Sequence, residues 1–145
     1  METFENALTI HRPVEDVFSF LADFGNVPRW NYAIEATRKT SPGPVGVGTT
    51  YSQTRSVPRR AEEGFEVTLF EPVSRLAIRG RIGPFQATMS YRLQPADGGT
   101  RLTNQVELEP ASAPLRLVAP VAVPRVRTAV AANLETLKRI LEGGG

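Results

Sequence analysis

The sequence predicts an α+β fold in which a bent antiparallel sheet of about seven strands wraps around a long C-terminal helix. Residues 49–109 hold strand-like segments joined by short connections, which favour antiparallel neighbours because a parallel crossover needs about a dozen residues. The tail after Pro110 instead carries its apolar residues at helical spacing. Two short helical segments follow the first strand directly, and this order completes the prediction.

Length and composition are those of a globular protein. The chain has 145 residues, of which 41% are hydrophobic and 22% are charged, and a chain of this size buries roughly 70% of its unfolded surface. We therefore expect one domain over residues 1–145. The first residues lack a basic segment followed by an apolar run, and no apolar stretch approaches the ~20 residues of a membrane span. The expected location is the cytoplasm.

Several classes of function are excluded or disfavoured by residue content. The 17 basic and 15 acidic residues give a net charge of +2, which is too small to indicate nucleic-acid binding. The absence of cysteine excludes disulfides and thiolate metal sites, and a single histidine, His11, excludes a histidine-rich metal centre. We expect neither a metal nor an organic cofactor, and the sequence does not set the oligomeric state.

The first third of the chain has the pattern of one strand and two short helices. Residues 3–10 alternate loosely as a strand, and Pro13 suits the first turn of a helix, where its missing N–H has no helical partner. An apolar stripe continues this helix: Val14, Val17, Phe18 and Leu21. Gly25 is expected to end it. Asn26 can cap a second short helix that carries Trp30 and reaches as far as Ile34.

Five strand candidates follow a loop rich in glycine and proline at residues 41–48. They are residues 49–56, 63–70, 75–82, 85–94 and 100–109. Alternation places their apolar side chains on one face and mostly polar ones on the other, as in an antiparallel sheet with one solvated face. Phe70 falls out of this alternation, and a bulge near Thr68 would turn it inward and bend the sheet.

The tail is helical but interrupted. Apolar residues recur in steps of four and three: Val126, Val130, Leu134, Leu137 and Leu141. Pro120 and Pro124 each lack the N–H of a normal helical hydrogen bond. We expect either a kink or a short helix over residues 113–119 followed by the main helix from about Pro124, which ends at Gly143.

Motifs spread over nearly the whole chain carry a resemblance to a known family. They are IHRPVEDVF at residues 10–18, LAD at 21–23, NVPRW at 26–30, FEP at 70–72 between Val67 and Arg75-Leu76, GGTRLT at 98–103, and Asn133-Leu134, Leu137-Lys138 and Leu141-Glu142 in the tail. With the order of elements, they resemble the polyketide cyclase/dehydrase and lipid-transport family (SRPBCC) of the START-like helix-grip superfamily. The resemblance implies a bent sheet that grips the last helix, with a cavity between them.

The inward positions of the strands and tail give the predicted ligand-binding residues. Most are apolar, with a few polar groups among them, which is the usual make-up of a small-molecule site. They are Trp30, Tyr51, Gln53, Arg55, Phe65, Val67, Ile78, Phe85, Met89, Tyr91, Asn104 and Val121. No catalytic residue and no metal ligand is assigned.

Each polar candidate has an alternative interpretation. Tyr91 is either a ligand contact or a core tyrosine with a satisfied hydroxyl, and the amide of Asn104 bonds neighbours, water or a ligand. Arg55 pointing inward could bind a carboxylate or polarise a ketone, whereas its place near a strand end favours solvation. Trp30 is either a stacking wall or an anchor between helix and sheet. His11 is expected in a surface turn, with no Ser or Cys partner.

The remaining charged residues are expected on the solvated face. Four carboxylates in two groups suit outward or turn positions: Glu62, Glu63, Glu107 and Glu109. A basic edge lacks the interleaved aromatic residues that bind single-stranded nucleic acid: Arg59, Arg60, Arg75, Arg79 and Arg81.

Three functions fit this sequence. The first is binding or transport of a hydrophobic or aromatic small molecule in the cavity between sheet and helix. The second is a polyketide cyclase, aromatase or dehydratase acting there, with Arg55 and Tyr51 as donors to the reacting carbonyl, although no acid or base has a clear inward position. The third is a protein-interaction module with a filled cavity.

Overall fold

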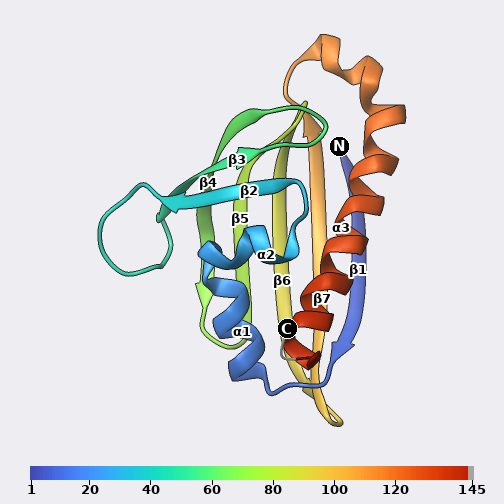
Figure 1. The fold of residues 1–145 in the computed structure, drawn as a ribbon. Coiled ribbons are helices and arrows are strands. Elements are labelled where there is room, and N and C mark those ends of the chain that lie inside the picture. Colours follow the sequence, from blue (N-terminus) through green and yellow to red (C-terminus); the bar gives the residue numbers. More distant parts are fainter. Residues whose placement is uncertain (144–145) are drawn as a thin grey trace.

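A computed structural model describes residues 1–143 and contains one seven-stranded antiparallel sheet with strand order β1-β7-β6-β5-β4-β3-β2 (Figure 1). Three α-helices and two short 3₁₀ helices complete it. The elements are β1 (Glu2–Ile10), α1 (Val14–Ala22), η1 (Phe24–Asn26), α2 (Val27–Trp30), β2 (Ile34–Lys39), β3 (Thr50–Arg55), β4 (Ala61–Glu71), β5 (Arg75–Ile82), β6 (Phe85–Ala96), β7 (Gly99–Pro110), η2 (Ala113–Val118) and α3 (Ala119–Gly143).

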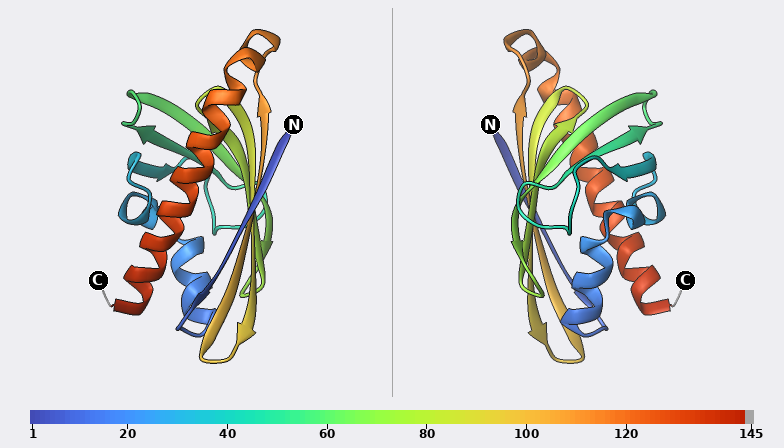
Figure 2. Two further views of the ribbon diagram at one scale, coloured as in Figure 1. Left: turned by 90° about the vertical axis from the view of Figure 1, so that its right-hand side faces the viewer. Right: turned by 90° about the vertical axis from the view of Figure 1, so that its left-hand side faces the viewer.

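The helices all lie against the same face of the sheet, which we call the inner face. Figure 2 shows α3 crossing this face obliquely, with α1 beside its C-terminal half and the strands curving around them. The predicted helix-grip architecture is confirmed. None of the helices within residues 1–143 is long and apolar enough to cross a membrane.

The N-terminal helices form where they were predicted, but their boundaries differ from the predicted ones. Pro13 is the N-cap of α1, just before the first turn in which the sequence analysis placed it. The helix ends at Ala22 rather than at Gly25, because Asp23 leaves the helical conformation (φ −85°, ψ 90°) and its side chain accepts the Gly25 N–H. The second helix ends at Trp30, and Ile34 belongs to strand β2, which the sequence analysis missed.

The predicted bulge in β4 is confirmed. The pairing of β4 with β5 shifts register between Val67 and Leu69, which is the position expected from the broken alternation. Phe70 consequently turns toward the helices, and its ring packs edge-on against Phe18 of α1 with 5.6 Å between centroids. The bulge thus joins the curved end of the sheet to the first helix.

The tail forms a 3₁₀ helix and then one continuous α-helix. Helix α3 begins at Ala119, earlier than expected, so that Pro120 lies in its first turn, where a missing N–H removes no helical bond. Pro124 lies inside the helix and removes one bond. The buried stripe of α3 reaches the inner face through Val130, Leu134, Leu137 and Leu141, as the spacing predicted.

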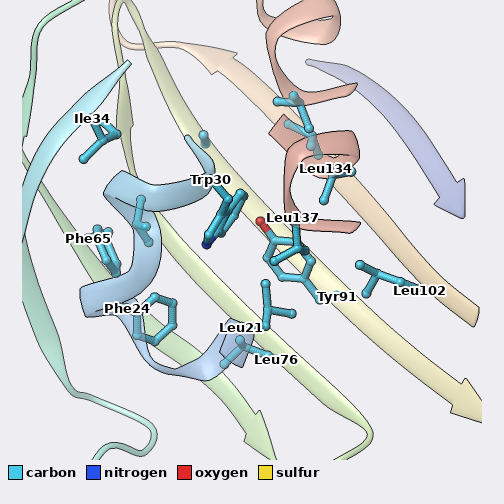
Figure 3. Packing of buried hydrophobic residues seen from close by; sticks show 14 of the residues in the cluster. Leu21, Phe24, Trp30, Ile34, Phe65, Leu76, Tyr91, Leu102, Leu134 and Leu137 are labelled. Carbon is cyan, nitrogen blue, oxygen red and sulfur yellow. The ribbon is translucent and has the colours of Figure 1, made fainter. Parts of the chain in front are cut away.

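The core lies between the inner face and the helices (Figure 3). Several side chains there have no exposed surface, among them Leu76 on β5, Leu102 on β7 and Leu137 on α3. The outer face carries the arginines of β5, and Arg75, Arg79 and Arg81 are exposed there, as predicted.

Gly80 of β5 lets two strands approach closely beneath the aromatic cluster. It pairs with Phe65 of β4, and a Cβ at this position would lie 2.6 Å from the Phe65 Cβ and would overlap the Gly64 carbonyl oxygen. The obstructing atoms are backbone or are attached to it directly, so they cannot move independently. Gly64 differs, because a Cβ there would lie 3.7 Å from the Tyr51 carbonyl oxygen, an ordinary contact.

We predict that Gly80→Ala lowers the free energy of unfolding by about 2 kcal/mol, the cost of overpacking a site that cannot relax. Gly64→Ala, one residue before the partner of Gly80, should change it by less than about 0.5 kcal/mol. Urea denaturation followed by circular dichroism measures both. Equal midpoints for the two variants would contradict the close approach of β4 and β5.

Candidate functional site

Strands β3 and β4 bring an aromatic cluster to the inner face. The register pairs Tyr51 with Phe65, and their rings stack with 5.0 Å between centroids. Phe24 of η1 covers both, at 4.8 Å from the Tyr51 ring and 5.4 Å from the Phe65 ring. Burial, followed by the nearby Asp23 carboxylate, raises the pKa of Tyr51. This cluster fixes which side of β3 and β4 faces the helices.

A polar cluster continues the same face toward the strand ends. The Nε of Arg55 lies 2.9 Å from Oε2 of Glu63, and the two side chains are only 13% and 6% exposed. The Gln53 amide donates to the other Glu63 oxygen at 3.2 Å, and the Gly83 backbone N–H donates to Oε2 at 3.2 Å. We call these four groups the Arg55–Glu63 cluster.

Two sequence interpretations are corrected here. Glu63 was expected to be outward, yet it shares the inner face with Phe65 because residues two apart on a strand point the same way. Of the two positions left open for Arg55, inward or solvated, the solvated one is wrong, because its side chain is largely buried. Each residue explains the burial of the other, because a buried charge is tolerated when it is paired with an opposite charge. Arg55 lies on β3 and Glu63 on the neighbouring strand β4. Glu62, on the other face, is exposed beside Arg38, as predicted.

Tyr91 and Trp30 bring two further polar groups inside. Figure 3 shows the Tyr91 hydroxyl directed from β6 toward the layer of α2 and α3, on the side of Trp30. The two residues are 5% and 8% exposed, and the buried indole N–H of Trp30 has no acceptor within residues 1–143. The Tyr91 hydroxyl makes no hydrogen bond in the described part of the chain, and burial raises its pKa. Whether Tyr91 contacts a ligand stays a prediction.

Asn104 lies on the same face, but its neighbours satisfy its amide. Its Oδ1 accepts from the Asn6 side chain at 3.3 Å, and its Nδ2 donates to the Ser90 carbonyl at 3.4 Å. The residue has no exposed surface. The structure thus supplies the partners that the sequence left open, and contact with a ligand stays a prediction.

A row of apolar residues crosses the middle of the inner face. The strand registers align Val67, Ile78, Met89 and Val106. The outer two have no exposed surface, whereas the central pair, Ile78 and Met89, is partly exposed. Solvent therefore reaches the middle of the inner face. Phe85 is fully buried farther along β6, while Val121 on the first turns of α3 is 60% exposed.

Two hollows are found elsewhere on the surface. One of about 450 Å³ lies between α1 and the C-terminal half of α3, against Arg12, Phe20 and Ile140. The other, of about 350 Å³, lies on the outer face between Glu66, Arg79 and Gln86. Both are open to solvent, and neither lies between the inner face and α3. The predicted cavity there, with its ligand contacts, stays a prediction.

Other candidates lie outside the inner face. His11 is exposed in the turn before α1, as predicted, and its backbone N–H donates to Glu142 at 2.8 Å. Within residues 1–143, no three His, Asp or Glu side chains gather closely enough to hold a metal ion.

The comparison with protein families decides the affiliation. A family model described as polyketide cyclase/dehydrase and lipid transport matches residues 1–142. The chain belongs to this family. The resemblance that the sequence motifs indicated is thereby confirmed over residues 1–142.

The relatives match over part of their length. The uncharacterized protein Rv2574 of Mycobacterium tuberculosis is 36% identical over 110 residues, which are 69% of this chain and 61% of that protein. The protein Mb2604 of Mycobacterium bovis matches equally. This chain thus spans less than two thirds of the curated relatives it matches.

Solved structures share the fold at low identity. The ZhuI aromatase/cyclase from Streptomyces sp. R1128 superposes with a TM-score of 0.76 at 15% identity, covering 99% of this chain and 98% of that one. The di-domain aromatase/cyclase StfQ of steffimycin biosynthesis gives 0.77 at 16% identity, covering 97% of this chain and half of that one. Ara h 8.0201 gives 0.74 at 14% identity, covering 97% of each. These likenesses concern the fold alone.

We predict that Glu63→Ala lowers the free energy of unfolding by about 3 kcal/mol, because it leaves the largely buried Arg55 without its counter-charge. The matched control is Glu62→Ala, which removes an exposed carboxylate from the adjacent position and should barely move the urea midpoint. Comparable losses in the two variants would contradict the structural difference between these neighbouring carboxylates.

We also predict a stability difference at alkaline pH. Unfolded Tyr91 loses its proton near the ordinary pKa of about 10, whereas burial in the folded protein holds the proton to higher pH. The wild-type protein should therefore lose stability relative to Tyr91→Phe as the pH rises above about 10, by about 1 kcal/mol at pH 11. Urea denaturation between pH 8 and 11 measures this difference. A constant difference over this range would show that the hydroxyl is not buried.

Proposed function

We propose that this protein binds a hydrophobic or aromatic small molecule between the inner face of the sheet and α3. The observation that carries the proposal is that two polar groups lack partners within residues 1–143, namely the buried Trp30 indole N–H and the hydroxyl of Tyr91, a residue that is 5% exposed. A buried donor without an acceptor costs free energy, which a ligand acceptor would offset. Because the row across the middle of the inner face is apolar, the matching ligand is largely apolar with a carbonyl-like oxygen.

The partly exposed pair Ile78 and Met89 supports the same location. These residues occupy the centre of the inner face, where a closely packed core would have buried them completely. A ligand that covers them removes apolar surface from water and gains roughly 25 cal/mol per Å², before the costs of ordering are subtracted. Binding would therefore depend on burial of the ligand, with Trp30 and Tyr91 setting its orientation.

The Arg55–Glu63 cluster restricts the charge of the ligand. Only the Nε of Arg55 is hydrogen-bonded within residues 1–143, so its Nη groups are available to a ligand oxygen. Glu63 neutralises the guanidinium, however, and would repel an anionic ligand that approached the same point. We therefore propose a neutral ligand whose oxygen atoms accept hydrogen bonds.

The test uses the neutral aromatic probe 1-aminoanthracene, whose fluorescence reports transfer into an apolar site. We expect saturable binding by the wild-type protein and a loss of at least about tenfold in affinity for Met89→Phe, which fills the centre of the inner face. The matched control is Thr88→Phe, which places the same side chain on the outer face of the same strand. Absence of binding, or equal affinity in both variants, would contradict the proposed site.

A polyketide cyclase or aromatase is the second candidate. The observation that favours it is the carboxylate of Glu63 beside Arg55 on the inner face, because this chemistry needs a donor to a carbonyl oxygen and a proton acceptor. Three donors already bond the oxygens of this carboxylate, so it is engaged within the cluster, which places this candidate second. Incubation with a linear poly-β-ketone and mass spectrometry of the products tests it. We expect the wild-type product pattern to equal that without protein, and cyclisation lost in Glu63→Gln would establish the enzyme instead.

A further inference from the structure

One end of the molecule carries a segment that stands clear of the sheet. It comprises η2 and the first turns of α3, residues 113–125, and we call it the projecting segment. In both views of Figure 2 and in Figure 1 it rises beyond the ends of the strands. Only one of its residues, Val123, is buried, at 8% exposure. The segment therefore meets the core along a single edge.

The outward side of the projecting segment is apolar. Leu117 is 85% exposed, Val121 is 60% exposed and Val118 is 43% exposed. Val121 follows Leu117 by four residues and Val118 by three, spacings that make it a neighbour of both on a helical surface. Exposure of single apolar residues is common, but three adjacent ones on a protruding point indicate a contact surface.

The charged residues near these three apolar side chains are all basic. Residues 110–134 contain Arg116, Arg125 and Arg127 and no Asp, Glu or Lys. Arg116 and Arg125 are exposed, and Arg127 lies over the Phe4 ring at 5.2 Å. In a chain with a net charge of only +2, this concentration of arginine without any carboxylate is a local feature. It complements a negatively charged partner.

We propose that the projecting segment docks on the surface of an anionic lipid bilayer. Leu117, Val118 and Val121 would enter the boundary between headgroups and acyl chains, and the arginines would contact the headgroups. Apolar residues flanked by arginine are typical of segments that lie in this interface, where each basic residue near the surface adds to the attraction.

The size and shape of the surface favour a bilayer over a protein partner. A stable protein interface takes roughly 20–30 residues from each side and matched shapes. The projecting segment offers three large apolar side chains on a convex point, which is too little for such an interface. A fluid bilayer adapts its shape to the inserting side chains, so the same surface suffices there.

The location connects this surface with the inner face. The Arg55–Glu63 cluster includes the Gly83 N–H in the β5–β6 turn, and the Pro84 carbonyl of that turn accepts from the Ala111 N–H, two residues before η2. The chain that leads into the projecting segment is thus bonded to the turn that completes the cluster. Docking there would hold the adjacent end of the inner face against the membrane. The proposal does not depend on the ligand proposed above.

The experiment is co-sedimentation of the full chain with large unilamellar vesicles. We expect binding to phosphatidylcholine vesicles with about 30% phosphatidylglycerol, little binding to pure phosphatidylcholine, and release by about 0.5 M NaCl. Leu117→Ser combined with Val121→Ser should reduce the partition coefficient at least about tenfold, because the apolar contact is lost. Arg116→Gln combined with Arg125→Gln should reduce it by about fivefold for each arginine removed.

Two control variants distinguish a local surface from general attraction. Val47→Ser removes an apolar residue that is 70% exposed in another loop, and Arg92→Gln with Arg101→Gln removes two exposed arginines from the sheet. Both should bind vesicles like the wild-type protein. The proposal is overturned if the wild-type protein does not bind anionic vesicles, or if the controls lose as much binding as the segment variants. A dimer in light scattering that Leu117→Ser with Val121→Ser converts to a monomer would overturn it as well, in favour of a second copy as the occupant.

Discussion

The packing of α3 on the inner face is the constraint on which the rest of the structure depends. In the C-terminal half of α3, the apolar residues Leu134, Leu137 and Leu141 are buried against the sheet. The turn between β1 and α1 holds the same half, because Arg12 donates to the Leu141 carbonyl at 2.8 Å and the His11 N–H donates to Glu142 at 2.8 Å. These bonds join the two ends of the described chain and close the sheet over its helix.

The opposite half of α3 is held far less firmly. Only Val123 and Val130 are buried there, and the helix continues into the exposed projecting segment. This asymmetry accounts for the partial exposure of Ile78 and Met89 at the centre of the inner face. The C-terminal half of α3 thus fixes the fold, and the ligand that we propose would cover the partly exposed residues at the centre of the inner face.

The fold could be predicted from the sequence because its signals are local. Alternation identified five strands and even the bulge near Thr68, and helical spacing identified the stripe of α3. The sequence analysis did not detect strand β2, because Ile34–Lys39 is a polar edge strand in which only Ile34 is fully buried. The segment therefore shows no alternation of apolar and polar residues. The boundaries around Pro124 were misplaced because tertiary packing of Val123 extends the helix over a proline that propensity alone would exclude.

The candidate site was harder to predict because its decisive contacts join different strands. Tyr51, Gln53 and Arg55 were placed on one face correctly, but Glu63 was assigned to an outward or turn position. The two-residue period from Phe65 to Glu63 was the signal that could have placed it inward. The missing partners of Trp30 and Tyr91 are a property of three-dimensional packing and leave no trace in the sequence.

The central claim is that a ligand occupies the space between the inner face and α3. Nuclear Overhauser measurements between 1-aminoanthracene and the labelled methyl groups of the protein test it most directly. Our account predicts contacts from the probe to the methyl groups of Ile78 and Met89 and to Leu134 on the facing helix. Contacts to Ile140, in the hollow between α1 and α3, with none to Ile78 or Met89, would contradict it and place binding on the outer surface of the helices.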